Sequence, residues 1–268
     1  MSDSIDSDRQ RYAARALACL DLTSLNLDDT VEAIDVLCDR AQSPAPGIEV
    51  RPAAVCVYGR FVAQCAARLG DNGIKVAAVA NFPLGTGTMY DVIVEVEQVL
   101  ADGADEVDVV LPFRAFVAGE SASAGEMIDI VSMMCHSRPN PAVLKVILET
   151  GVLGDVSTIK SAARLAVANG ADFLKTSTGK LEPAATPEAA AALLDVIAES
   201  RAEGRDIGLK VAGGVKTVDD AAVYLDLADQ ALPGGALPSN FRFGASGLLN
   251  DLVRVLGGSL DTHMSTDY

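Results

Sequence analysis

The segment VLKVILETGVLGDVSTIKSAARLAVANGADFLKTSTG, residues 143–179, holds two short apolar runs separated by an amphipathic stretch. Both runs are almost continuously apolar instead of alternating with polar residues, which is typical of strands buried on both faces of a parallel sheet. The stretch between them, 157–170, opens with serine and closes on Asn-Gly, as many helices do. The segment therefore predicts a strand, a helix and a second strand parallel to the first.

The same alternation recurs along the chain. Helical stretches at 186–204 and 217–230 each open with threonine, and the first also has proline at its first helical position and glycine at its end. With the two runs above, at 143–151 and 172–179, the apolar runs number eight; the other six are 19–25, 53–58, 75–83, 106–112, 207–214 and 241–246.

Eight such units in 268 residues, with no linker longer than the loop at 43–52, favour one domain. A (β/α)8 barrel typically needs about 250 residues. The predicted fold is thus an α/β protein, a single (β/α)8 barrel over residues 1–268, with a short N-terminal extension and a flexible tail from about residue 257. An open doubly wound sheet is the alternative. It is weakened because no GxGxxG motif follows the first run and no Walker-type loop is present.

Composition restricts the partners. The net charge of −16 makes nucleic acid and anionic membranes poor partners, and no apolar stretch is long enough to span a membrane. The polar, acidic N-terminus resembles no signal or transit peptide, so a cytoplasmic protein is expected. Five cysteines without a CxxC pair are expected to be buried thiols, and two isolated histidines predict no metal site. Asp28 and Asp29 are predicted to cap the helix that follows the first run.

Charged residues lie inside the apolar runs. Three of the seven lysines do so: Lys145 in VLKVI, Lys175 in FLKTS and Lys210 in GLKVA. Lysine is seldom buried unless it is paired or deprotonated, and a structural ion pair would explain one such lysine more easily than three. Asp21 in CLDLT and Asp108 in EVDVVL show the same anomaly, and strand alternation places Asp108 on the same face as Glu106. These side chains predict a charged network in the barrel mouth.

Amine catalysis needs such an arrangement. Burial and a second ammonium both lower the pKa of a lysine, which frees its amine to attack a carbonyl. A nearby carboxylate can then move protons during dehydration and carbon–carbon cleavage. The runs predict Lys175 as the nucleophile, with Lys210 and Asp108 beside it.

Glycine-rich segments lie at the ends of the last three runs. They are TSTGK at 176–180, AGGVKT at 212–217 and FGASG at 243–247. Glycine amides and helix N-termini bind phosphate well, and barrels often carry a phosphate site after their last two strands. Ordinary turns between strand and helix also use glycine, but three such segments together favour a phosphate site.

These segments resemble those of deoxyribose-phosphate aldolase, a class I aldolase family. The resemblance rests on DLTSLN, GADEVDVVLP, LKVILETG, ADFLKTSTGK, KVAGGVKT and RFGAS and runs from about residue 20 to about residue 250. It implies a (β/α)8 barrel that needs no metal or other cofactor. It also implies reversible cleavage of 2-deoxy-D-ribose 5-phosphate to D-glyceraldehyde 3-phosphate and acetaldehyde in deoxynucleoside breakdown, by an enzyme that is often a homodimer.

The resemblance also assigns roles. Lys175 matches the Schiff-base lysine, Lys210 the lysine that lowers its pKa, and Asp108 the aspartate of the proton relay. Lys145 matches a lysine that flanks the relay, and Asp21 and Thr23 match a segment near the sugar hydroxyls. The family's phosphate contacts fall on Gly179, Lys180, Gly213, Gly214, Lys216, Gly244 and Ser246, with Gly247 beside them.

The chain departs from the family pattern at a few positions. Val211 follows Lys210 where many members have proline or alanine, and Gly247 replaces a second serine, so a hydroxyl contact to phosphate is lost there. Tyr268 ends the tail as a tyrosine does in some members, where it reaches into the site. Cys56 matches a position near the site, although a packed core thiol is the simpler interpretation.

Two other functions fit a phosphosugar-binding barrel. One is an isomerase or synthase that uses a carboxylate base, but such an enzyme does not need the buried lysine pair. The other is a non-catalytic sensor, which would tolerate the loss of Asp108.

Overall fold

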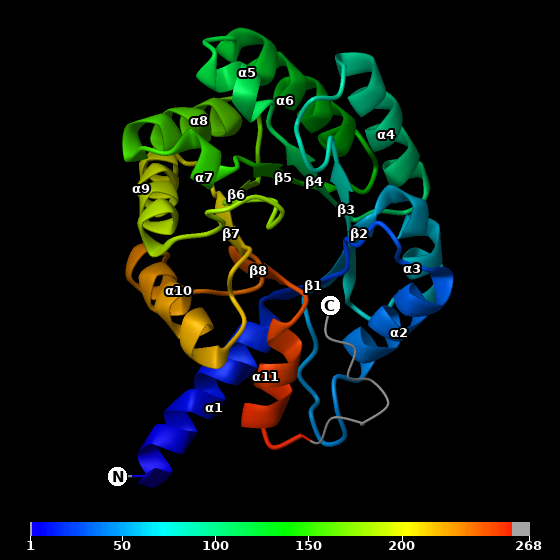
Figure 1. The fold of residues 1–268 in the computed structure, drawn as a ribbon, viewed down its shortest axis with the longest axis vertical. Coiled ribbons are helices and arrows are strands. Elements are labelled where there is room, and N and C mark those ends of the chain that lie inside the picture. The colour runs from blue at the N-terminus through cyan, green and yellow to red at the C-terminus, as the bar shows by residue number, and fades with distance from the viewer. Residues whose placement is uncertain (1, 259–268) are drawn as a thin grey trace.

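A computed structural model describes residues 2–258 of the chain, with side chains from residue 7 onward. Eight parallel strands form a closed barrel in which each strand pairs with the next and the last with the first, and Figure 1 shows the helices arranged around it. Each strand lies inside one predicted run, so the predicted (β/α)8 barrel is confirmed. The strands are β1 (Leu20–Thr23), β2 (Ala54–Tyr58), β3 (Lys75–Ala80), β4 (Glu106–Val110), β5 (Val143–Ile147), β6 (Phe173–Lys175), β7 (Gly208–Ala212) and β8 (Phe241–Ala245).

The helices follow the strands in alternation. The predicted tail at 257–268 follows the last helix, and all of it beyond residue 258, Tyr268 included, lies outside the described residues. The helices are α1 (Ser2–Ala18), α2 (Val31–Gln42), α3 (Val62–Leu69), α4 (Met89–Ala101), α5 (Phe113–Val117), α6 (Ser121–His136), α7 (Thr150–Leu153), α8 (Val156–Ala168), α9 (Pro187–Ala202), α10 (Val218–Ala231) and α11 (Leu248–Val255), with a short 3-10 turn, η1 (Gly59–Phe61), before α3.

The helix starts agree with the sequence in part. Thr186 caps α9 and Thr217 caps α10, as predicted. Helix α8 instead begins after Asp155, whose carboxylate caps it by accepting a hydrogen bond from the backbone of Thr158 at 3.0 Å.

The cap predicted at Asp28 and Asp29 is wrong. Thr30 caps α2 by accepting a hydrogen bond from the backbone of Ala33 at 3.2 Å. The carboxylate of Asp29 is already occupied, because it accepts hydrogen bonds from the Ser24 hydroxyl and the Asn26 backbone within the preceding turn.

The N-terminal extension is a helix. Helix α1 packs against α10 and α11 at the side of the barrel (Figure 1). Its side chains reach across to α10, where Arg15 pairs with Asp229 at 2.5 Å and Arg9 with Asp219 at 3.1 Å. No helix in residues 2–258 is both long and apolar enough to cross a membrane.

The inside of the barrel has an apolar part and a charged part. Strands β2 and β3, with Leu25 from the segment after β1, contribute a small apolar cluster of buried side chains that is separate from the main core between strands and helices. Strands β4 to β8 and β1 contribute charged side chains that are almost fully buried. The apolar cluster consists of Leu25, Ala54, Cys56, Ala77 and Val79, with Tyr58 and Phe82 packed against it. A charged site therefore lies beside an apolar wall in one barrel interior.

Candidate active site

Seven ionisable side chains form one network inside the barrel. Each is at most 7% exposed, so water screens their charges little. The network holds four groups able to carry positive charge and three carboxylates: Lys145, Lys175, Lys210 and Arg242, and Asp21, Glu106 and Asp108.

Asp108 lies at the centre of the network. Its Oδ2 accepts hydrogen bonds from Lys175 Nζ at 2.8 Å and Lys210 Nζ at 2.7 Å, and its Oδ1 accepts one from Lys145 Nζ at 2.8 Å. The strand register produces this arrangement, since Lys175 on β6 lies beside Lys210 on β7, and Asp108 on β4 lies beside Lys145 on β5. Burial raises the pKa of Asp108, but the three lysines outweigh burial and hold that pKa well below its usual value. Asp108 is therefore a carboxylate shared by three amines.

Glu106 and Arg242 complete the network at a distance from Lys175. Arg242 binds both oxygens of Glu106, at 2.9 and 3.1 Å, and also reaches Asp21 at 2.7 Å. Glu106 in turn contacts Lys145 Nζ at 2.5 Å, and Asp21 contacts Lys210 Nζ at 2.5 Å. Neither Glu106 nor Arg242 was among the site residues predicted from the sequence. The signal was present, because Arg242 stands in the apolar run FRFGAS just as Lys175 stands in FLKTS.

Lys175 differs from the other two lysines in its proton affinity. Burial and the adjacent Lys210 ammonium lower the pKa of Lys175, although Asp108 acts in the opposite direction. Burial also lowers the pKa of Lys145 and of Lys210, but the carboxylates that contact them outweigh it and raise both pKa values. If Lys175 is neutral, three cations face three carboxylates, so the charge balance of the network agrees with these directions. Lys175 is thus the amine most readily freed for attack.

Cys56 and Thr23 flank the network without entering it. Cys56 is fully buried on β2, with its Sγ 4.0 Å from Asp108 Oδ2, and burial raises the pKa of its thiol. This environment agrees with a packed thiol and not with a reactive thiolate. The Thr23 hydroxyl donates to the backbone carbonyl of Asp21 at 2.7 Å, at the end of β1.

The predicted phosphate segments converge at the ends of adjacent strands. Gly179 and Gly213 approach so closely that a Cβ on Gly213 would stand 3.0 Å from the Cα of Gly179, and both have a positive φ. A Cβ on Gly244 would stand 3.0 Å from Lys210 Cε, so glycine there leaves room for the lysine. The segments lie at the ends of β6, β7 and β8, at the same end of the barrel as Lys175. Their exposed members include Gly179, Lys180, Gly214, Lys216, Ser246 and Gly247, and Gly213 and Gly244 are half-buried.

Helices α10 and α11 present different N-termini to this region. The backbone N–H groups of Lys216 and Thr217 both donate to Asp220, so α10 caps itself and withdraws them from a ligand. Helix α11 follows Gly247, and no side chain in the described residues caps it. An anion at these strand ends would therefore meet the α11 terminus, while Lys216 would contribute through its exposed ammonium.

Glu149 fixes the turn after β6 and was not among the residues predicted from the sequence. It follows β5 in the left-handed region, with φ 57°, and is fully buried. Its Oε2 accepts hydrogen bonds from the backbone and the hydroxyl of Thr178, at 3.2 and 2.5 Å, and the same hydroxyl accepts from the backbone of Lys180 at 3.1 Å. Burial raises the pKa of Glu149. The conformation of the TSTGK turn thus rests on a carboxyl group from the neighbouring strand end.

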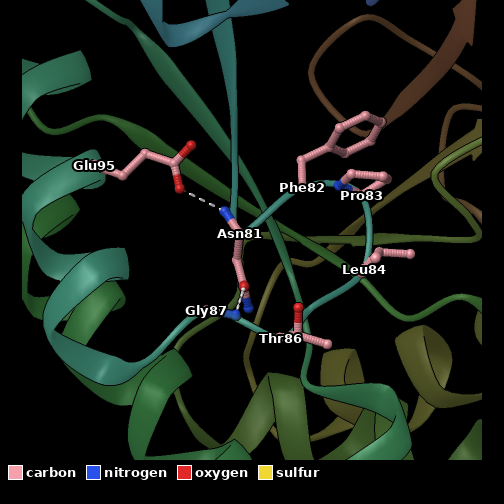
Figure 2. A pocket seen from close by; sticks show the side chains of 7 residues that line it. All are labelled: Asn81, Phe82, Pro83, Leu84, Thr86, Gly87 and Glu95. Carbon is pink, nitrogen blue, oxygen red and sulfur yellow. Dashed lines mark hydrogen bonds between the residues drawn. The ribbon is translucent and has the colours of Figure 1, made fainter.

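A separate pocket of about 250 Å³ lies after β3 (Figure 2). Asn81 turns the chain there with φ 56°, its backbone N–H donating to Glu95 at 2.7 Å while its side-chain oxygen accepts from Gly87 at 2.8 Å. In Figure 2 the ring of Phe82 points away from these hydrogen bonds. The Phe82 ring packs edge-on against the Tyr58 ring, with the two ring centroids 5.9 Å apart. The turn therefore positions part of the apolar wall of the barrel.

The fold and the network define a class: a (β/α)8-barrel enzyme with a buried amine and a shared carboxylate. Comparison with known proteins gives the family, since residues 15–252 match the DeoC/LacD family aldolases. The chain belongs to this family, and it is an aldolase, a carbon–carbon lyase. This finding sets aside the isomerase and the non-catalytic barrel as alternatives.

Individual relatives agree with the family. A deoxyribose-phosphate aldolase from Agrobacterium fabrum is 45% identical over 258 residues, which is 96% of each chain. The crystal structure of a candidate deoxyribose-phosphate aldolase from Toxoplasma gondii is similar, with a TM-score of 0.80 and 28% identity over 94% of this chain and 96% of that one. The tetrameric deoxyribose-phosphate aldolase from Aeropyrum pernix shares the fold, with a TM-score of 0.74 and 24% identity over 93% of this chain and 94% of that one.

Proposed function

We propose that the chain cleaves 2-deoxy-D-ribose 5-phosphate reversibly to D-glyceraldehyde 3-phosphate and acetaldehyde, through a Schiff base on Lys175. One observation carries this proposal: Lys175 and Lys210 bind the same oxygen of Asp108, and the Lys175 pKa alone among the three buried lysines is lowered. A neutral amine beside a charged one is the arrangement that makes a lysine nucleophilic at neutral pH.

The residues of the network supply the proton steps. The Lys175 amine attacks the C1 aldehyde, and the carbinolamine loses water when a proton reaches its hydroxyl. The iminium draws the electrons of the C2–C3 bond as the C3 hydroxyl loses its proton, which releases glyceraldehyde 3-phosphate. The remaining enamine is protonated at C2 and hydrolysed to acetaldehyde. Asp108 accepts a hydrogen bond from the Lys175 nitrogen, and Lys210 donates to the same Asp108 oxygen. We therefore assign the proton transfers to Asp108 and Lys210.

The surface around the strand ends supports an anionic substrate. The net charge of the chain is −16, so a phosphate needs local positive charge. Lys180, Lys216 and the α11 terminus after Gly247 provide it at the end of the barrel where Lys175 lies. The name of the Agrobacterium relative is consistent with a phosphorylated deoxyribose.

The substrate assignment has a direct test. Lys180→Met and Lys216→Met should each lower kcat/KM for deoxyribose 5-phosphate by about 10- to 100-fold, the effect of one charge-assisted hydrogen bond, and leave unphosphorylated deoxyribose almost unaffected. Release of acetaldehyde, the product that both sugars give, measures both reactions in a coupled assay. Lys75→Met is the matched control, because Lys75 lies at the start of β3 and pairs with Asp105 on the surface. Equal losses on both sugars would contradict a phosphate role for these lysines.

Replacing Lys210 should shift the pH dependence. In Lys210→Met the repulsion on Lys175 disappears, so the Lys175 pKa rises and the acid limb of kcat/KM should move up by about one pH unit or more. Lys160→Met, which removes a surface ammonium paired with Asp195, should leave the limb in place. An unshifted limb in Lys210→Met would remove Lys210 from this role.

Other expectations stay predictions. They are a single domain over residues 1–268, cytoplasmic location, a role in deoxynucleoside breakdown, a homodimer, a reaction that needs no cofactor or metal, and contacts from Asp21, Thr23 and Lys145 near the sugar. Lys145 contacts three carboxylates and is fully buried, so its proposed influence on the substrate acts through Asp108.

A further inference from the structure

The Glu106–Arg242 pair lies inside the barrel and outside the reacting groups. Glu106 is two residues nearer the start of β4 than Asp108, and Arg242 lies beside Lys210 in the strand register. We propose that Glu106 and Arg242 are positioning residues that set the charge state of Lys175 from within the barrel, without touching the substrate. This inference rests on the proposed function, because it concerns the same nucleophile.

Contacts connect the pair to Lys175 without interruption. Arg242 binds Asp21 at 2.7 Å, Asp21 binds Lys210 at 2.5 Å, and Lys210 shares Asp108 with Lys175. A second route runs from Glu106 through Lys145, at 2.5 Å, to Asp108. Every group on both routes is at most 7% exposed. A unit charge removed at one end is therefore felt at the other with little screening.

Other groups face these residues from the packed elements. Around Lys175 they are Asp108 on β4, Lys210 on β7 and Cys56 on β2, and the charge of Lys175 acts in turn on Glu149. Around Arg242 they are Asp21 on β1, Glu106 on β4 and the thiol of Cys19, with the Phe173 ring 5.8 Å from its guanidinium. Burial raises the pKa of Cys19 to about 12, so that thiol adds no charge at neutral pH.

The charge count gives the pair its effect. Three carboxylates balance the charges of Lys145, Lys210 and Arg242, so a proton on Lys175, which also contacts Asp108, would add a fourth positive charge. Loss of the Glu106 charge leaves an excess of positive charge, which favours the free amine still more. Loss of the Arg242 charge leaves a carboxylate in excess, which favours the ammonium. Stability alone does not require this pair, since apolar residues can often replace buried ion pairs without loss of stability.

The test uses two single variants and their combination. Glu106→Gln should move the acid limb of kcat/KM to lower pH, and Arg242→Met to higher pH, by about one unit each. The combined variant restores the balance and should return the limb to its original position. Glu199→Gln and Arg164→Met are the matched controls, because that exposed pair carries the same charges on the surface and should shift nothing.

Borohydride trapping with acetaldehyde separates the possible failures. If the unaltered protein gives no adduct on Lys175, the proposed function fails. If the adduct forms but both single variants keep the original limb, or both shift in the same direction, the positioning role is overturned. Circular dichroism reports whether Arg242→Met folds. If Arg242→Met does not fold, Glu106→Gln, which keeps the shape of the side chain, tests the positioning role on its own. A shift of its acid limb to lower pH supports that role, and an unchanged limb or a shift to higher pH overturns it.

Discussion

Lys175→Met should abolish cleavage of deoxyribose 5-phosphate, with kcat lowered by about 10⁴-fold or more. Methionine has a similar length and no amine, so no Schiff base can form. The charge balance adds a second expectation: without Lys175, Asp108 still binds Lys145 and Lys210, so the free energy of unfolding should stay almost unchanged. A coupled assay and urea unfolding measure the two quantities.

Lys180→Met is the appropriate comparison, because it removes an exposed lysine from the same segment and should retain the chemical step at saturating substrate. A Lys175→Met protein that keeps more than a few per cent of the original kcat would contradict a nucleophilic role for Lys175.

Asp108→Asn should damage both activity and stability. The variant removes the acceptor that Lys145, Lys175 and Lys210 share, and it leaves buried ammonium groups without a counter-charge. Breaking a buried pair on one side costs about 3–5 kcal/mol, so the free energy of unfolding should fall by about that amount. Loss of the proton relay should lower kcat by about 10²- to 10⁴-fold. Urea unfolding and steady-state kinetics measure these effects separately.

Asp195→Asn provides the contrast, because Asp195 pairs with Lys160 on the surface, where an ion pair contributes about 1 kcal/mol or less. An Asp108→Asn protein as stable as Asp195→Asn would show that the lysines at Asp108 do not depend on its charge.

The barrel was predictable because its strands are buried on both faces. Continuous apolar runs with glycine or proline stops mark such strands, and each of the eight runs contains one. The meeting of Lys175, Lys210 and Asp108 in one buried network was predictable for a related reason, since a charge within an apolar run stands out. The N-terminal helix was not, because its packing against α10 and α11 depends on partners more than 200 residues away, such as Asp219 and Asp229.

The missed site residues depend on contacts across the barrel. Arg242 carried the same signal as Lys175, but only the closed barrel brings it to Glu106, which is 136 residues away in sequence. Glu149 follows a strand end, where charged residues are ordinary, and its left-handed backbone and its hydrogen bonds to Thr178 are visible only in three dimensions. The start of α10 also differs from a free anion-binding helix N-terminus, because the backbone N–H groups of Lys216 and Thr217 donate to Asp220.

The proposed reaction requires the Lys175 amine to form a Schiff base. Borohydride reduction in the presence of acetaldehyde, followed by mass spectrometry of the peptides, tests it most directly. The expected result is one ethyl adduct on Lys175, none on Lys145 or Lys210, and none anywhere in Lys175→Met. An adduct on Lys210 instead, or an unchanged adduct in Lys175→Met, would contradict it.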